Sequence, residues 1–183
     1  RANYGRIRRL ILAVKKNKKF QVQVILMSSP LLNKYGELER LLKLDKITVD
    51  YKIFSHVEGE NHITMVKSTA LALMDLPTAY SNLKPDYIFL VGDRFEALSA
   101  AIAASFMNIF LIHIQGGELS GSIDENIRHS ITKLSHLHFV CTERAKRILI
   151  RMGENPSDVF NVGCPSIDEI KKINFNQIIN LKK

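Results

Sequence analysis

The sequence lacks the residues and patterns that mark several classes of protein. Its 183 residues include no tryptophan and only two cysteines, Cys141 and Cys164. No apolar run approaches the ~20 residues that span a bilayer, and no signal-peptide pattern opens the chain, so we expect no membrane segment. Two isolated cysteines are too few for a disulfide scaffold or a cysteine-rich metal site. We therefore expect buried free thiols in a cytoplasmic protein.

Several catalytic signatures are missing as well. The chain has no Gly-x-Ser-x-Gly nucleophile elbow, no Walker loop and no Gly-x-Gly-x-x-Gly dinucleotide fingerprint. No spacing of His, Cys and Asp is typical of a metal site, so we expect no metal ligands.

The charge is unbalanced, with 26 basic and 18 acidic residues and a formal net charge of +8. Such a balance predicts an anionic partner, and nucleic acid is one candidate. The basic residues are dispersed or terminal, however, and the cluster from Lys15 to Lys19 ends a predicted helix, where lysines favour the helix dipole. No basic strand carries the aromatic residues that stack on bases. We therefore expect no nucleic-acid binding.

Hydrophobic periodicity predicts alternating helices and strands. The predicted strands are 20–27, 47–54, 87–91, 109–114, 137–141 and 159–162. The predicted helices are 4–16, 38–44, 61–76, one that starts at Phe95, 123–134 and 143–152. Continuous apolar strands between helices are typical of a parallel sheet covered on both faces. The sequence therefore predicts an α/β fold with a Rossmann-like, doubly wound parallel sheet.

Within the predicted helix 61–76 the apolar residues Ile63, Val66, Ala70 and Met74 recur at helical spacing. We expect this face to point into the core and Pro77 to kink or end the helix.

The chain enters its first helix directly after Arg1-Ala2-Asn3. In a doubly wound fold a central strand normally precedes that helix, so we expect the first strand to be missing and apolar surface to be exposed in its place. The tail after Ile170 is polar. We therefore assign residues 1–170 to one lobe and residues 171–183 to the start of a linker.

Three polar clusters lie where a ligand of an open α/β sheet would bind, outside the carboxyl ends of the strands. They are the turn around Arg1 and Asn3, the segment 92–94, and the segment from His113 to His129. Each has a structural alternative. Asp93 can cap a helix, Gly116 and Gly117 can permit a tight turn, and acidic residues in a first helical turn favour its dipole. Arginine beside aspartate at a helix start also suits a phosphate and a proton transfer.

Five ordered segments resemble those of the hydrolysing UDP-N-acetylglucosamine 2-epimerases, near the sialic-acid and legionaminic-acid branch. The similar segments are RANYG (1–5), VGDRFEA (91–97), LIHIQGGE (111–118), SGSIDENIRH with the following ITKLSH (120–136), and VGCPS (162–166). The resemblance covers residues 1 to about 170. It implies the N-terminal lobe of a two-lobed, glycosyltransferase-B-like architecture.

The resemblance also implies a reaction. The family cleaves UDP-N-acetylglucosamine to N-acetylmannosamine and UDP: a base removes the C2 proton as UDP leaves C1, and water then adds to the glycal. No cofactor is implied, and the full-length enzyme is expected to be a dimer or tetramer. By motif position the expected catalytic residues are Asp93, Gln115, Glu118, Asp124 and Glu125. The expected substrate-binding residues are Arg1, Asn3, Gly5, Arg94, His113, Gly116, Gly117, Arg128, His129, His136 and His138.

Two departures from the family pattern bear on the substrate. Gln115 and Asn3 stand where family members carry acidic residues, and an amide cannot transfer a proton as a carboxylate does. Glu118 is one substitute; alternatively, Gln115 binds a different sugar, such as a UDP-diacetamido-trideoxyhexose or GDP-N-acetylglucosamine. A glycosyltransferase and a non-catalytic nucleotide-sugar-binding lobe stay open as alternatives. Because the family's second lobe is not in this sequence, we expect the 183 residues alone to be inactive.

Overall fold

A computed structural model describes residues 4–32, 34, 38–59, 61–165 and 167 of the chain. The helices are α1 (Tyr4–Lys16), α2 (Leu38–Leu44), α3 (His62–Leu83), α4 (Phe95–Phe106), α5 (Ile123–Leu134) and α6 (Glu143–Arg151), with short 3₁₀ turns η1 (Ser29–Leu31) and η3 (Pro156–Asp158). The strands are β1 (Ile25–Met27), β2 (Tyr51–Ile53), β3 (Tyr87–Val91), β4 (Phe110–Ile114), β5 (Leu137–Val140) and β6 (Val159–Asn161).

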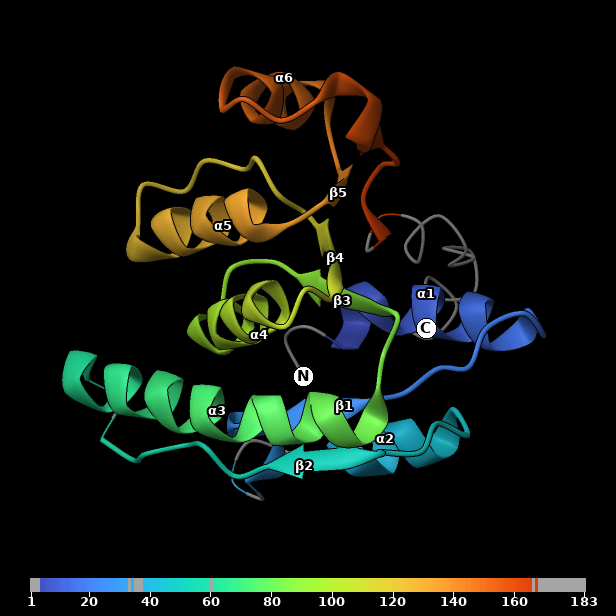
Figure 1. The fold of residues 1–183 in the computed structure, drawn as a ribbon, viewed down its shortest axis with the longest axis vertical. Coiled ribbons are helices and arrows are strands. Elements are labelled where there is room, and N and C mark those ends of the chain that lie inside the picture. Colours follow the sequence, from blue (N-terminus) through green and yellow to red (C-terminus); the bar gives the residue numbers. More distant parts are fainter. Residues whose placement is uncertain (1–3, 33, 35–37, 60, 166, 168–183) are drawn as a thin grey trace, which may run out of the picture.

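The strands form two parallel sheets. One has the order β1-β2 and the other has the order β3-β4-β5-β6. Helices α3, α4 and α5 pack on one face of the sheet, and α1 and α2 pack on the other face. In Figure 1 α4 and α5 lie to the left of β4 and β5, and α3 runs across the view in front of β1. The predicted α/β fold with a parallel, doubly wound sheet is confirmed.

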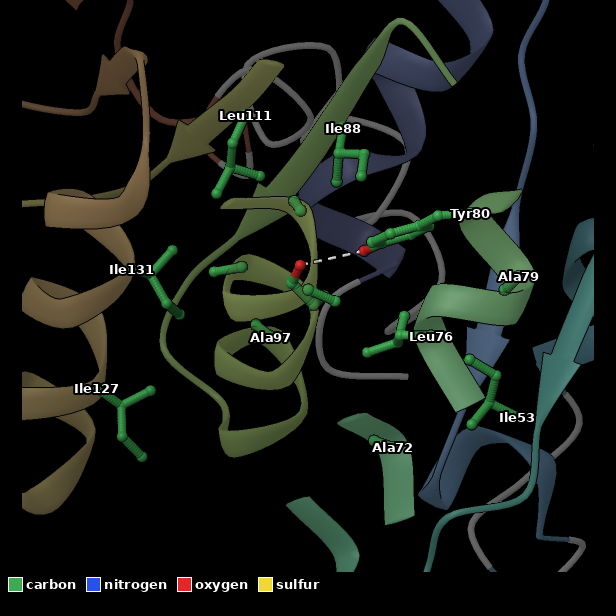
Figure 2. Close-up of a cluster of buried hydrophobic side chains, with 14 residues drawn as sticks. Ile53, Ala72, Leu76, Ala79, Tyr80, Ile88, Ala97, Leu111, Ile127 and Ile131 are labelled. Atoms are coloured by element: carbon green, nitrogen blue, oxygen red, sulfur yellow. Dashed lines mark hydrogen bonds between the residues drawn. The ribbon is translucent and has the colours of Figure 1, made fainter. Parts of the chain in front are cut away.

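The main core lies between the sheet and the layer of α3, α4 and α5. Figure 2 shows Leu76 and Tyr80 of α3 facing the alanine-rich α4, with Ile127 and Ile131 of α5 on the far side. The Tyr80 hydroxyl donates a hydrogen bond to the Ala100 carbonyl oxygen at 3.2 Å, and burial raises the pKa of this phenol. Small residues on α4 let the neighbouring helices approach closely.

The predicted orientation of α3 is wrong. Ile63, Val66 and Met74 are 69%, 68% and 77% exposed, while the opposite face, with Ala72, Leu76 and Ala79, is buried. Shape explains the difference, because the small side chains of α4 accept a close partner and long side chains would hold the helices apart. The helix also continues past Pro77 to Leu83.

The first two strands are shorter than predicted, with three residues each instead of eight. β1 borders a groove of about 1430 Å³ that is also lined by β3 and by apolar side chains of α1. Within the described chain β1 pairs only with β2, and β3 pairs only with β4. The sheet is therefore interrupted where the sequence predicts a missing central strand.

An ion-pair network fixes the start of α1. Tyr4 and Arg8 both donate hydrogen bonds to the Asp45 carboxylate, which follows α2, and the Arg8 Nε to Asp45 Oδ2 distance is 2.7 Å. The Arg8 and Tyr4 hydrogen bonds lower the pKa of Asp45 to about 2.

In the part of the chain that the structure describes, no helix is both long enough and apolar enough to cross a bilayer.

Candidate functional site

The carboxyl ends of β3 and β4 open at the same edge of the sheet. The Gly92 amide donates to the Ile114 carbonyl oxygen at 3.0 Å, and the Gln115 amide donates to Phe139 at 2.8 Å. Gly92 and Gln115 both have positive φ, at 78° and 66°. A positive φ turns the chain sharply, and for the non-glycine Gln115 this conformation stores strain of the kind found at functional sites.

The start of α1 lies beside this edge. A Cβ atom placed on Gly92 would lie 3.5 Å from Nη1 of Arg6, which is in the first turn of α1. Gly5 is next to Arg6 and has open space around its Cα. The first turn of α1 therefore lies beside the β3–α4 turn, while Arg1 and Asn3 of the predicted cluster lie outside the described residues.

Arg128 lies at the centre of the site and connects its loops through hydrogen bonds. Its guanidinium, on α5, pairs with the Asp93 carboxylate and donates to the Glu118 carbonyl oxygen, and it lies 3.5 Å from the Ser120 hydroxyl. Arg128 is only 5% exposed, whereas the Asp93 side chain is 22% exposed. Arg128 thus joins the β3–α4 turn to the β4–α5 loop, and the Asp93 carboxylate is fixed while one side of it reaches solvent.

Arg94 supplies a partly exposed cation beside Asp93. Its Nε and Nη2 atoms donate to the two carboxylate oxygens of buried Glu96 at 3.0 and 3.1 Å. These bonds, reinforced by the charges of Asp124 and Asp93, raise the pKa of Arg94. The side chain is 43% exposed, so a fixed positive charge is available at the mouth of the site.

Glu125 orders the loop that precedes α5. Its carboxylate accepts hydrogen bonds from the Ser120 and Gly121 amides at 2.6 and 2.8 Å, and these bonds lower its pKa. His129 lies one turn further along α5, with Nε2 at 4.0 Å from Glu125. Asp124 is exposed in the first turn of the same helix.

His113 is a buried side chain that supports the site through two hydrogen bonds. Nε2 lies 2.9 Å from the Gly92 carbonyl oxygen and Nδ1 lies 3.1 Å from the Thr132 hydroxyl. Because a carbonyl can only accept, Nε2 carries the proton and Nδ1 accepts from Thr132. Burial lowers the pKa of His113 to about 4. Both ring nitrogens are occupied within the protein, and the ring fixes the turn at Gly92.

Close packing explains the two glycines after Gln115. A Cβ atom on Gly116 would lie 3.0 Å from Thr132 Oγ1, and one on Gly117 would lie 2.6 Å from the Ala145 carbonyl oxygen of α6.

The Gln115 amide lies 3.8 Å from the Cys164 thiol. Burial raises the pKa of the neighbouring Cys141 to about 11, so this thiol stays protonated at neutral pH.

The structure does not bring His136 and His138 to this edge. His136 precedes β5, where Nδ1 accepts from the Leu111 amide at 3.1 Å and the ring stacks on Phe110. His138 is 1% exposed within β5, and its Nε2 lies 3.1 Å from Glu154. Burial lowers the pKa of His138. Both rings serve packing and hydrogen bonding away from the carboxyl ends of the strands.

Two supporting residues, Glu96 and Thr132, were not predicted from the sequence. Each carries a spacing signal: Glu96 is two residues after Arg94, and Thr132 is one helical turn after Arg128 on the same face of α5. Among the described residues, no group of three or more His, Cys, Asp or Glu side chains is arranged to hold a metal ion. The arrangement offers oriented carboxylates beside a cation, which suits proton transfer next to a bound phosphate.

The chain is similar to known proteins in both sequence and fold. The profile of the family described as UDP-N-acetylglucosamine 2-epimerase matches residues 12–182. A UDP-N,N'-diacetylbacillosamine 2-epimerase (hydrolyzing) of Legionella pneumophila is 38% identical over 170 residues, which are 93% of this chain and 45% of the relative. A GDP/UDP-N,N'-diacetylbacillosamine 2-epimerase (hydrolyzing) of Campylobacter jejuni is 37% identical over 188 residues, 100% of this chain and 48% of the relative.

A solved structure has a similar fold to this chain. The UDP-GlcNAc 2-epimerase of Neisseria meningitidis bound to UDP-GlcNAc aligns with a TM-score of 0.81 and 22% identity, over 99% of this chain and 50% of that one. The chain thus spans about half the length of the proteins that it matches. From the family profile and from two relatives above 30% identity, we conclude that this chain belongs to the UDP-N-acetylglucosamine 2-epimerase family.

Proposed function

We propose that the protein containing this chain hydrolyses a UDP-linked 2-acetamido sugar to UDP and the free sugar with C2 inverted. The observation that carries the proposal is the Arg128–Asp93 ion pair beside Arg94 at the carboxyl end of β3. It holds a carboxylate in one orientation next to a cation, as elimination of a diphosphate requires. The free product is a precursor of the type used for nonulosonic acids.

The roles of the residues follow from the charges that develop during the reaction. Asp93 removes the C2 proton as the C1–O bond to UDP breaks, and Arg94 neutralises the departing diphosphate. Water then adds across the resulting double bond, with its hydroxyl at C1 and a proton at C2. Asp124 delivers that second proton, because it lies in the first turn of α5 and is close enough for its charge to act on Arg94.

The substrate that we favour carries a second acetamido group. Both relatives named above, at 37–38% identity, are named for N,N'-diacetylbacillosamine. Gln115 supports this choice, because an amide at the carboxyl end of β4 donates and accepts hydrogen bonds as an acetamido group requires. UDP-N-acetylglucosamine is the competing substrate, supported by a 30% identical Neisseria meningitidis relative named for it.

We propose that residues 1–170 form the N-terminal lobe, that residues 171–183 begin the link to a second lobe, and that the sugar nucleotide binds between the two lobes. The partly exposed Arg94 and the exposed Asp124 fit this arrangement, since they face solvent at the open edge of the sheet. The 183 residues alone would then bind weakly and not turn over.

The test follows each nucleotide sugar by NMR in D₂O, with the chain extended at both ends to the length of its relatives. We expect UDP and a free sugar inverted at C2 that carries deuterium there, with higher kcat/KM for the diacetamido substrate. Asp93→Asn and Asp124→Asn should each lower kcat at least ~100-fold. Asp86→Asn is the matched control, because Asp86 precedes the same strand at its opposite end.

Three outcomes would contradict the proposal. Release of sugar without inversion or deuterium would indicate simple hydrolysis. Transfer of sugar to an added acceptor would indicate a glycosyltransferase. Full activity of Asp93→Asn would remove Asp93 from the chemistry.

A further inference from the structure

The two cysteines of the chain lie in contact, although they are far apart in the sequence. The Cys141 and Cys164 side chains hydrogen-bond each other, and the Gln115 Nε2 atom lies 3.8 Å from the Cys164 sulfur. Both cysteines are reduced, and each is partly exposed to solvent. Two thiols in contact are positioned for a disulfide, because that bond forms only between cysteines whose Cβ atoms already lie close together.

Pairing of β5 with β6 brings the two cysteines together. Cys141 directly follows β5, and the amide of Val162, just after β6, donates to the Val140 carbonyl oxygen at 3.0 Å. Gly163 has a positive φ of 76°, which turns the chain after β6 and leaves Cys164 beside Cys141. The contact is therefore set by strand pairing at the carboxyl edge of the sheet, next to the candidate site.

Cys164 is the better nucleophile of the pair. Burial, together with the charge of Cys164, raises the pKa of Cys141 to about 11, so the Cys141 thiol keeps its proton and can donate it in a hydrogen bond to the Cys164 sulfur. The Gln115 amide is a second donor to the same sulfur. Two donors stabilise a thiolate at Cys164, and the thiolate is the reactive form of cysteine.

We propose that Cys141 and Cys164 are an oxidation site, at which a low-molecular-weight disulfide such as oxidised glutathione converts the two thiols to an intramolecular disulfide. The new bond weakens binding of the sugar through Gln115. This effect on the sugar rests on the proposed function, whereas formation of the disulfide does not.

The reaction consists of two thiol–disulfide exchanges. The Cys164 thiol loses its proton to water, and its sulfur attacks one sulfur of oxidised glutathione. The S–S bond of glutathione breaks, and one glutathione leaves and takes up a proton. The Cys141 sulfur then loses its proton and attacks the Cys164 sulfur, which releases the second glutathione in the same way. The two protein thiols lose two electrons in total, and one molecule of oxidised glutathione is reduced to two thiols.

Oxidation changes the surroundings of Gln115. In the disulfide the Cys164 sulfur cannot carry a negative charge, and it becomes a weaker acceptor for the Gln115 amide. Gln115 is only 8% exposed, and a side-chain amide at such a buried position requires a hydrogen-bond partner. We therefore expect the amide to change its orientation, which weakens its hydrogen bond to an acetamido group of the sugar.

Peptide mass spectrometry after incubation with oxidised glutathione tests the site, with the chain extended at both ends to the length of its relatives. We expect a disulfide between residues 141 and 164 within one molecule, which dithiothreitol reverses. Gln115→Met should slow its formation about fivefold, because the substitution removes one donor to the Cys164 sulfur.

Two matched serine variants test the order of the steps. Cys141→Ser should stop at a mixed disulfide between Cys164 and one glutathione, because the second thiol is missing. Cys164→Ser should leave Cys141 unmodified at neutral pH over the same period, since burial keeps that thiol protonated. Circular dichroism of each variant checks that the fold is retained. Absence of the link between residues 141 and 164 in millimolar oxidised glutathione, or equally fast modification of both variants, would overturn the proposal.

Turnover of the nucleotide sugar tests the effect on Gln115. We expect kcat/KM of the oxidised protein to be lower by at least about fivefold, the effect of one lost hydrogen bond, and to recover with dithiothreitol. Cys164→Ser is the control, because its hydroxyl still accepts from Gln115 and its activity should not respond to oxidised glutathione. An unchanged kcat/KM in fully oxidised protein would contradict control of the sugar site. Absence of turnover in the reduced protein would instead contradict the proposed function, and the mapped disulfide would still decide whether the oxidation site exists.

Discussion

His113 illustrates how a residue in a recognisable segment can support a site from behind. The ring is fully buried, and its two nitrogens connect the Gly92 carbonyl oxygen with the Thr132 hydroxyl. These bonds join the β3–α4 turn, which carries Asp93, to α5, which carries Arg128. His113 therefore positions the ion pair at the centre of the site.

We predict that His113 makes the fold sensitive to mild acid. Its pKa is about 4 in the folded chain against 6.5 for a free imidazole, so below pH 6.5 the unfolded chain binds a proton that the folded chain resists. Stability should fall between pH 6.5 and 4, by about 3 kcal/mol in total at 1.36 kcal/mol per pKa unit. The melting temperature of His113→Gln should be lower at pH 7.5 and should depend less on pH across this window.

The control for this prediction is His62→Gln, at an exposed histidine in the first turn of α3. It should keep the wild-type pH profile. Buried His138 adds to the slope in the same direction, so His113→Gln should reduce the slope without abolishing it. An unchanged slope in His113→Gln would show that His113 does not resist protonation.

At the residue scale, the sequence predicts which side chains gather but not which of them reach solvent. Position after a strand was enough to group Asp93, Arg94 and Glu118 at one edge, because parallel strands end together. Burial distinguishes the roles of the two arginines at this edge. The Arg128 side chain is buried, whereas the Arg94 side chain is partly exposed to solvent. Burial depends on packing between distant elements, which local sequence patterns do not contain.

At the element scale, the β4–α5 loop depends on its contact with α6. Gly117 has φ of 79°, and its backbone lies so close to α6 that an added Cβ atom would be 2.6 Å from both the Ala145 carbonyl oxygen and Leu149 Cδ1. Gly121, in the same loop, has a similar φ of 69° but open space around it. Substitutions at these two glycines therefore distinguish the cost of a positive φ from the cost of a steric conflict.

We predict that Gly117→Ala destabilises the fold far more than Gly121→Ala. The second substitution carries only the cost of positive φ, about 1 kcal/mol. The first adds displacement of α6, a further 1–3 kcal/mol typical of overpacking, by rough estimate. Urea unfolding at pH 7.5 gives both free energies. Equal values for the two variants would mean that the loop moves away from α6 freely.

The helices and strands themselves were largely predictable, because apolar runs between turn residues identify strands in a parallel sheet. The predicted helix at residues 143–152 agrees with α6, and the strand at residues 87–91 agrees with β3. The orientation of α3 was not predictable from periodicity, since both of its faces are apolar and only the alanine-rich surface of α4 decides between them. Periodicity measures hydrophobicity, whereas close packing also depends on side-chain size.

At the scale of the whole molecule, the groove between β1 and β3 has the dimensions and chemistry of a strand position. It is bordered by strand edges without pairing partners in the described chain and is lined by apolar side chains such as Ile7, Ile11 and Leu90. One added parallel strand would join the two sheets into the order β2-β1-new-β3-β4-β5-β6. Such a strand would end at the carboxyl edge of the sheet, where α1 begins beside Gly92.

We predict that a five- to six-residue segment rich in Val and Ile, joined in front of Arg1, raises the melting temperature by several degrees and suppresses aggregation. The segment would satisfy backbone groups of both strand edges and bury the apolar lining of the groove. The control replaces the central residue of the segment with proline, which has no N–H to donate and cannot occupy a central strand. If both segments raise the melting temperature equally, the gain comes from general hydrophobic contact. A gain confined to the proline-free segment would instead show that hydrogen bonding to β1 and β3 completes the sheet. The amides of Phe89 and Val91, which face away from β4, should then become protected from hydrogen exchange.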